Sequence, residues 1–180
     1  PPSKVTNPDA VTLTVATSSE APSIKRRLAA LPYEGLVVLS VVIIAAFPVS
    51  GLKGAALSGA PQLLFQAYLF CVMAAYFTWC WRHGGQTLAM KTWRIRVVNS
   101  AGDPLSFATA LTRFICALLF FGPACAGIVL LFFHDRVSPV FAMWAFLPMI
   151  ATILWARHDA DGQFLHDRMA GTRLVDAKRS

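Results

Sequence analysis

The amino-acid sequence predicts an all-α membrane protein, a four-transmembrane-helix bundle with a cytoplasmic loop that contains a short amphipathic or extended segment. Three observations lead to this fold class. Of the 180 residues, 56% are hydrophobic and 14% are charged, whereas a soluble domain carries about 25% charged residues. The chain contains four long apolar stretches, and its Lys and Arg residues flank these stretches.

The apolar stretches cover residues 28–52, 63–81, 107–133 and 140–156. A helix needs about 20 apolar residues, within a range of roughly 17–25, to cross the hydrocarbon core. Backbone polar groups cannot remain unpaired in lipid, so each stretch should be helical. Runs such as VVLSVVIIAAF do not alternate as the strands of a β-barrel do. Gly122–Pro123 should bend the third span, either as one long helix or as two shorter pieces.

The basic residues predict the orientation of the chain. Fourteen of the 16 Lys and Arg residues lie in the N-terminal segment, in the connection between spans two and three, or in the C-terminal segment. The other two connections contain only Lys53 and Arg136. Four spans place the three basic segments on one side, which the positive-inside rule makes cytoplasmic. Both termini are therefore expected in the cytoplasm.

The composition along the chain predicts one membrane domain with two short tails. Residues 1–22 are rich in Ser, Thr, Pro and Ala and are expected to form a disordered cytoplasmic tail. Residues 23–175 form the transmembrane domain, and residues 176–180 form the C-terminal tail. The formal net charge of +7 is spread around the apolar segments. Anionic lipid headgroups are therefore the expected partner, and nucleic acid is not.

The four cysteines lie inside apolar stretches and form no CxxC pair. Thiols in such positions usually pack as small hydrophobes, so we expect them to be buried and inert. The histidines have no metal-ligand spacing. The sequence therefore predicts neither a metal site nor a cofactor.

The connection after span two carries the most distinctive loop, with the sequence GGQTLAMKTWRIRVVN at 84–99. Its glycine pair does not make a phosphate-binding loop, because no strand precedes it and no glycine directly precedes the lysine. The segment is expected to lie at the membrane interface, with its basic and aromatic side chains near lipid headgroups. The expected headgroup contacts are Trp93, Arg94 and Arg96. The residues singled out as the loop motif are Gly85, Gln86, Thr87 and Lys91.

Three segments carry a resemblance to a known family: RRLAALPYEG at 26–35, GGQTLAMKTWRIRVVNSAGDPLSFATALTR at 84–113, and FLHDRMAGTRLV at 164–175. In this order they resemble the RDD family of small bacterial membrane proteins, which is named after one arginine and two aspartates. The resemblance implies that Arg27 is the family arginine and Asp167 the second aspartate. Glu34 stands where the family has its first aspartate. The resemblance also implies a multi-pass protein of the bacterial cytoplasmic (inner) membrane.

The charged signature residues support two interpretations. Arg27 and Glu34 are seven residues apart, so they share one helix face at a rise of roughly 10 Å. A carboxylate within a span is costly, so Glu34 should face the bundle interior, and Arg27 and Asp167 should be neighbours. The three side chains either hold the bundle together as an ion-pair cluster or carry ions or protons. His166, next to Asp167, is a candidate proton relay.

Two functions remain open at this point. Some RDD relatives are described as cation/proton antiporters, so the resemblance implies ion or small-solute transport coupled to cations or protons. Four helices are few for a transport path, so a homo-oligomer or a larger complex is expected. The alternative is a membrane scaffold or assembly factor that docks a cytoplasmic partner or anionic lipid. An enzyme is not expected, because the sequence contains no catalytic triad, zinc motif or nucleotide loop.

Overall fold

The computed structural model describes residues 21–50, 59–133 and 138–177. Most of the predicted N-terminal tail, residues 1–20, lies outside the described residues, as do Lys53 and Arg136. The elements in chain order are α2 (Ile24–Ser50), α3 (Ala60–Arg82), α4 (Leu88–Thr92), β1 (Ile95–Asn99), α5 (Phe107–Phe133), α6 (Pro139–Trp144), α7 (Leu147–His158), α8 (Leu165–Met169) and β2 (Thr172–Asp176).

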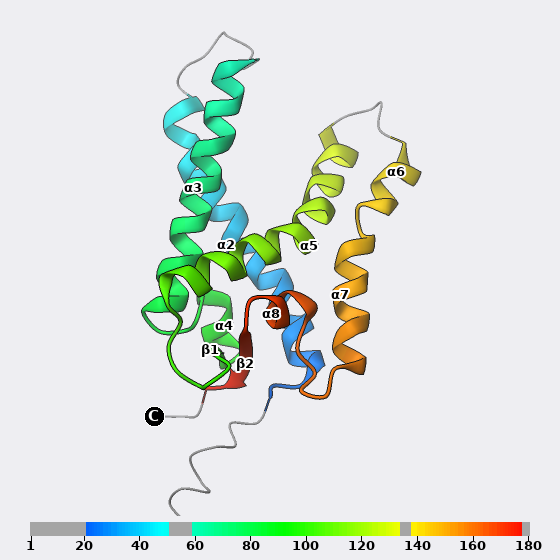
Figure 1. Ribbon diagram of the computed structural model, residues 1–180. Coiled ribbons are helices and arrows are strands. Elements are labelled where there is room, and N and C mark those ends of the chain that lie inside the picture. Colours follow the sequence, from blue (N-terminus) through cyan, green and yellow to red (C-terminus); the bar gives the residue numbers. More distant parts are fainter. Residues whose placement is uncertain (1–20, 51–58, 134–137, 178–180) are drawn as a thin grey trace, which may run out of the picture.

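Three helices are long and apolar enough to cross a membrane. The candidate spans are Ile24–Pro48 in α2, Ala60–Arg82 in α3 and Phe107–Val129 in α5. The predicted multi-pass helical architecture is thus confirmed for these three segments. α5 is one continuous helix with Pro123 inside it, and Figure 1 shows that it is bent. Of the two forms open for this span, the single bent helix is the one observed.

The fourth predicted span, 140–156, is not a single helix. α6 ends at Trp144, and α7 begins at Leu147 with Pro148 in its first turn. Proline is tolerated at the start of a helix, but in an interior it removes a backbone hydrogen bond and clashes with the preceding turn. The apolar stretch is therefore divided into two short helices, neither of which is long enough to be a candidate span.

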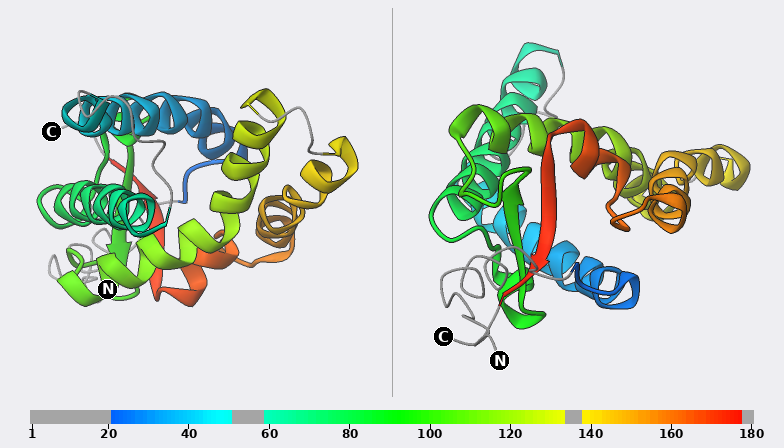
Figure 2. Two further views of the ribbon diagram at one scale, coloured as in Figure 1. Left: turned by 90° about the horizontal axis from the view of Figure 1, so that it is seen from above. Right: turned by 60° about the horizontal axis from the view of Figure 1, so that its bottom comes forward.

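The long helices pack at one end against a layer of short helices and strands. Figure 1 shows α2 and α3 side by side, α5 crossing below and then rising away from them, and α6 and α7 returning beside the second half of α5. We call the layer of α4, β1, α8 and β2 the cap. Both ends of the described chain lie at the cap, and Figure 2 shows its two strands lying between α2 and α5.

The cap is held by an antiparallel strand pair. β1 pairs with β2, with Ile95 opposite Asp176 and Asn99 opposite Thr172. Ile95, Val97 and Leu174 are buried in the core that joins the cap to the helix ends. Asp176, the first residue assigned to the C-terminal tail, therefore belongs to the sheet. Its pairing partner in β1 is Ile95.

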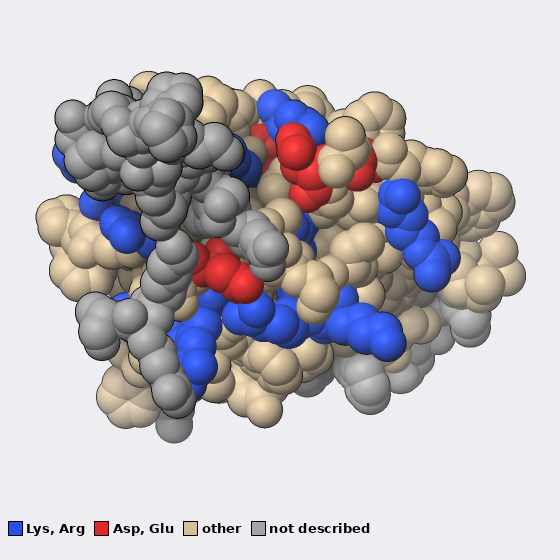
Figure 3. All heavy atoms as spheres, turned by 90° about the horizontal axis from the view of Figure 1, so that it is seen from below, with Lys and Arg blue, Asp and Glu red and all other residues tan. Residues whose placement is uncertain are grey.

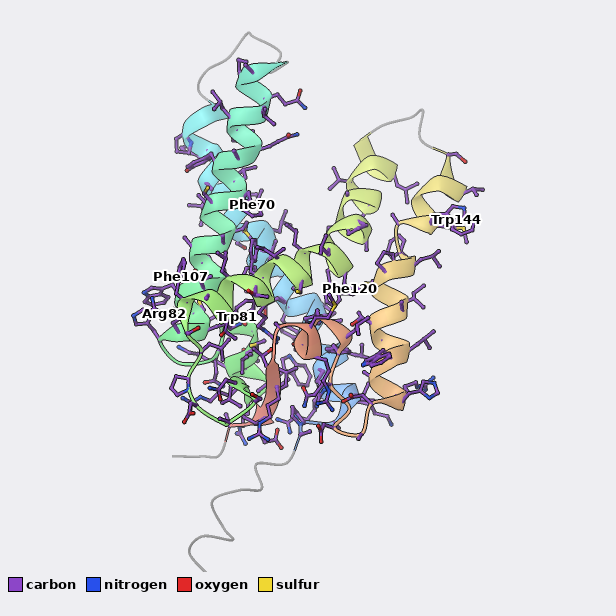
Figure 4. The ribbon with its side chains drawn as sticks, viewed as in Figure 1. Phe70, Trp81, Arg82, Phe107, Phe120 and Trp144 are labelled. Carbon is purple, nitrogen blue, oxygen red and sulfur yellow. The ribbon has the colours of Figure 1, made fainter. Side chains whose placement is uncertain are left out.

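The helix surfaces away from the cap are apolar and exposed. Ile44 and Leu64 have relative exposures of 72% and 71%, and Figure 4 shows Trp144 at the end of the molecule opposite the cap. Figure 3 shows Lys and Arg side chains spread over the cap face, with a few acidic groups between them. An apolar body with one charged end suits a membrane rather than water.

Candidate functional site

A buried ion pair joins the cap to the bundle. Asp167 of α8 is 0% exposed and Arg113 of α5 is 3% exposed. Arg113 Nη1 donates to Asp167 Oδ1 and, at 2.7 Å, to Thr172 Oγ1. The Arg113 guanidinium also lies 4.9 Å from the centre of the Trp81 ring. One side chain therefore connects α5 to α8, to β2 and to the end of α3.

Arg27, the family arginine by resemblance, holds a neighbouring turn. Its side chain is buried, and its Nη1 donates to the backbone carbonyl of Gly162. Its guanidinium lies 5.9 Å from the centre of the Phe164 ring. Arg27 and Asp167 lie within range of each other's charge, but the ion-pair partner of Asp167 is Arg113. Because the turn before α8 presents a carbonyl to α2 while Asp167 faces α5, Arg27 satisfies the backbone instead of the carboxylate.

Glu34 lies within the first candidate span and meets the loop motif. Its Oε2 accepts a hydrogen bond from Thr87 Oγ1 at 2.7 Å. Its Oε1 is buried and has no hydrogen-bond partner among the described residues. Glu34 was expected to have a polar partner, and the structure shows that this partner is Thr87, 53 positions along the chain. The carboxyl group keeps one oxygen free to change its hydrogen bonding.

The loop motif builds the cap around this contact. Gly85 has a φ of +68°, and its carbonyl accepts from the Val97 N–H at 2.7 Å. A Cβ at Gly85 would lie 2.6 Å from the Val97 carbonyl oxygen, so only glycine fits there. Gln86 Nε2 donates to the Ile95 carbonyl at 2.8 Å. Thr87 begins α4 by accepting from the Met90 N–H at 3.2 Å.

His166 packs in an aromatic environment beside the ion pair. Its ring stacks on Phe164 at 5.6 Å and meets Phe121 edge-on at 5.3 Å. Its Nε2 lies 3.3 Å from Asp167 Oδ1. Burial lowers the pKa of His166 to about 4, although the charge of Asp167 acts in the opposite direction. A pKa in this range favours the neutral imidazole near pH 7, and a role of His166 as a proton relay stays a prediction.

A second arginine, which sequence reasoning counted only as part of a basic segment, ties α2 to the strands. Arg26 Nη1 pairs with Asp176 Oδ1 at 2.7 Å, and its Nη2 donates to the Trp93 carbonyl at 2.6 Å. The Trp93 ring meets the Tyr33 ring edge-on at 5.8 Å, so this indole faces α2. Arg94 and Arg96 are exposed, and their contact with headgroups stays a prediction.

The cysteines differ from expectation. Cys116 is buried, but Cys71 and Cys125 are exposed, and all four thiols are free. The exposed two lie on the outward sides of α3 and α5, where an apolar side chain suits lipid as well as it suits a core. Among the described residues, no group of three or more His, Cys, Asp or Glu side chains is placed to hold a metal.

Aromatic side chains mark the junction of helices and cap. Arg82, at the end of α3, lies 5.9 Å from the centre of the Phe107 ring at the start of α5, and Figure 4 shows the two side chains together. Further along the same helices, the Phe70 and Phe114 rings lie 5.5 Å apart. These pairings hold the second half of α3 against the first part of α5, beside the buried ion pair.

Long apolar helices standing on a charged cap define a multi-pass helical membrane protein. The RDD family model matches residues 21–171, from just before α2 to the turn before β2. The chain therefore belongs to the RDD family. No curated protein and no solved structure matches it.

Proposed function

We propose that the protein moves a cation or another small solute across the bacterial cytoplasmic membrane in exchange with protons, with Glu34 as the proton-carrying group. The proposal rests on the hydrogen bonding of this carboxyl group. One oxygen accepts a hydrogen bond from Thr87, and the other is buried and has no hydrogen-bond partner among the described residues. Ionisable groups inside spans are costly and usually belong to ion or proton pathways. The free oxygen is where a proton would bind.

The proposal includes a fourth membrane crossing made by α6 and α7 together. Residues 139–158 would rise about 30 Å as one crossing, which matches the hydrocarbon core. A break within a membrane-spanning segment is tolerated where the broken backbone lies against protein. Both short helices contact α5. This topology brings both termini and the cap to the cytoplasmic side, in agreement with the basic residues.

The proposal also includes a homo-oligomer or a larger complex. Only 11% of the most apolar 18-residue segment is buried in each of the first two candidate spans, Ile24–Pro48 and Ala60–Arg82. Such helices have faces available to lipid or to neighbouring subunits. A path for a solute that passes Glu34 would then run between copies of the chain, because one copy offers few helices to enclose it.

Proton flux in proteoliposomes tests this function. The parent chain is reconstituted with a pH-sensitive dye inside and is challenged with sodium, potassium and other cation gradients. We expect cation-dependent proton flux from the parent and from Glu34→Asp, which keeps a titratable carboxyl. Glu34→Gln keeps the shape but carries no proton, so its flux should be lost.

Asp103→Asn is the matched control, because Asp103 is an exposed acid in the turn before α5 and should be dispensable. Equal flux from Glu34→Gln and the parent, or no flux from the parent under any gradient, would contradict transport by this carboxyl.

The alternative is a scaffold or assembly factor that docks a cytoplasmic partner or anionic lipid. The observation in its favour is the cap surface, over which Lys and Arg side chains are spread (Figure 3). A scaffold tolerates Glu34→Gln if the fold survives, and its function depends instead on the exposed basic residues of the cap. The flux experiment therefore separates the two functions.

A further inference from the structure

A groove runs between α2 and α3 and ends at the cap. It encloses about 470 Å³. Its walls include Val37, Val41 and Ile44 of α2 and Trp79 of α3, and Gln86 and Lys91 of the cap connection also line it. Ligand sites commonly occupy about 300–1,000 Å³. The groove is therefore large enough to hold a substantial part of an amphiphilic molecule.

The two ends of the groove differ in chemistry. The end away from the cap is apolar, whereas the cap end has the ammonium group of Lys91 and the imidazole of His83. None of the residues that line the groove is acidic. A small soluble anion would leave the apolar walls uncovered, and a cation would be repelled by Lys91. The lining fits a molecule with an anionic head and an apolar tail.

The groove also opens in the direction from which such a molecule would come. Trp79 and Leu88 line it and have relative exposures of 62% and 63%. Trp79 lies near the cap end of α3, and Leu88 is the first residue of α4 in the cap. Lys91 can extend along this surface with its stem against apolar atoms and its ammonium at the phosphate level.

We propose that this groove binds an anionic phospholipid of the cytoplasmic leaflet. One acyl chain lies between α2 and α3 against Val41 and Trp79, and the headgroup phosphate pairs with Lys91. This site goes beyond the proposed transport function. It shares α4 with that function, because Thr87 begins the helix and bonds Glu34, while Lys91 lies in its last turn.

Lipid titration monitored by native mass spectrometry tests the site. The full chain in detergent is titrated with phosphatidylglycerol and with phosphatidylcholine of the same acyl chains. We expect the parent to prefer phosphatidylglycerol. Lys91→Ala should weaken phosphatidylglycerol binding about fivefold, the effect of about 1 kcal/mol per basic residue near an anionic lipid. Because Lys91 is exposed, this change does not threaten the fold.

Two further variants separate the parts of the site. Val41→Trp fills the groove and should weaken binding of both lipids, whereas Lys25→Ala removes an exposed lysine outside the groove and should change neither. Equal phosphatidylglycerol binding by Lys91→Ala and Lys25→Ala would overturn the proposal. Displacement of the lipid by inorganic phosphate at comparable concentration would also overturn it, in favour of a free-phosphate site. Flux is measured in a separate assay, so the two proposals fail independently.

Discussion

The ion pair between Arg113 and Asp167 should dominate the stability of the junction between bundle and cap. In Arg113→Met, the Asp167 carboxylate keeps its 0% exposure but loses its counter-charge. Removing one partner of a buried ion pair costs about 3–5 kcal/mol, because the remaining charge is uncompensated. Thr172 also loses the donor that lies 2.7 Å from its hydroxyl oxygen, which adds about 1 kcal/mol.

Denaturant titration in mixed micelles measures this loss, and two further variants make it interpretable. Arg168→Met removes an arginine of α8 whose side chain is 44% exposed and pairs with Asp159 and Asp161, whose side chains are 7% and 64% exposed. Because Arg168 itself is partly exposed to solvent, the loss in this control should be smaller than the loss in Arg113→Met, in which both partners are buried. Arg113→Met combined with Asp167→Leu removes both charges and should recover much of the stability lost in the single variant.

A loss in Arg113→Met no larger than that in Arg168→Met would show that the carboxylate is not buried as described. A loss in the double variant equal to the sum of the losses in Arg113→Met and Asp167→Leu would show that the pair is not energetically coupled.

Two further predictions concern the effect of cap residues on the stability of the fold. The folded-state pKa of His166, about 4, lies below its ordinary value of 6.5, so the unfolded chain binds this proton more readily. The parent should therefore lose about 3 kcal/mol as pH falls from 6.5 to 4, and His166→Gln should be less sensitive to pH in that window by the same titration. Gly85→Ala combines a φ of +68° with a Cβ 2.6 Å from the Val97 carbonyl oxygen and should cost about 1–3 kcal/mol. At Gly84, nothing lies within 4 Å of an added Cβ, so Gly84→Ala is the matched control in thermal unfolding, and equal losses would contradict the Gly85 geometry.

Hydropathy predicted α2, α3 and α5 because a membrane span requires a long uninterrupted apolar segment. Such a segment is visible in consecutive residues and needs no knowledge of tertiary contacts. The same reasoning missed the division between α6 and α7. A count of apolar residues does not register that Pro148 sits where a continuing helix would need a backbone donor. Only the position of the proline within the stretch carried that signal.

The interaction partners of the buried charged side chains were harder to predict from the sequence. Arg113 was counted with the basic connection, although it lies six residues inside an apolar helix, and that placement was the available signal for burial. The contact between Glu34 and Thr87 joins residues far apart in the chain and has no local signature. Arg26 and Arg27 are adjacent, and only the turn around Gly162 and the edge of β2 decide what each one binds.

The proposed topology has the cap in the cytoplasm and α6–α7 as a fourth crossing. Labelling of single cysteines with a membrane-impermeant maleimide, in a background without the four native cysteines, measures it directly. Gly54→Cys, outside the described residues, and Ser138→Cys, before α6, should react in intact cells. Ser100→Cys, in the turn after β1, and Ser180→Cys, also outside the described residues, should react only after permeabilisation. Labelling of Ser138→Cys and Ser180→Cys from the same side would contradict the fourth crossing, and labelling of Ser100→Cys in intact cells would contradict a cytoplasmic cap.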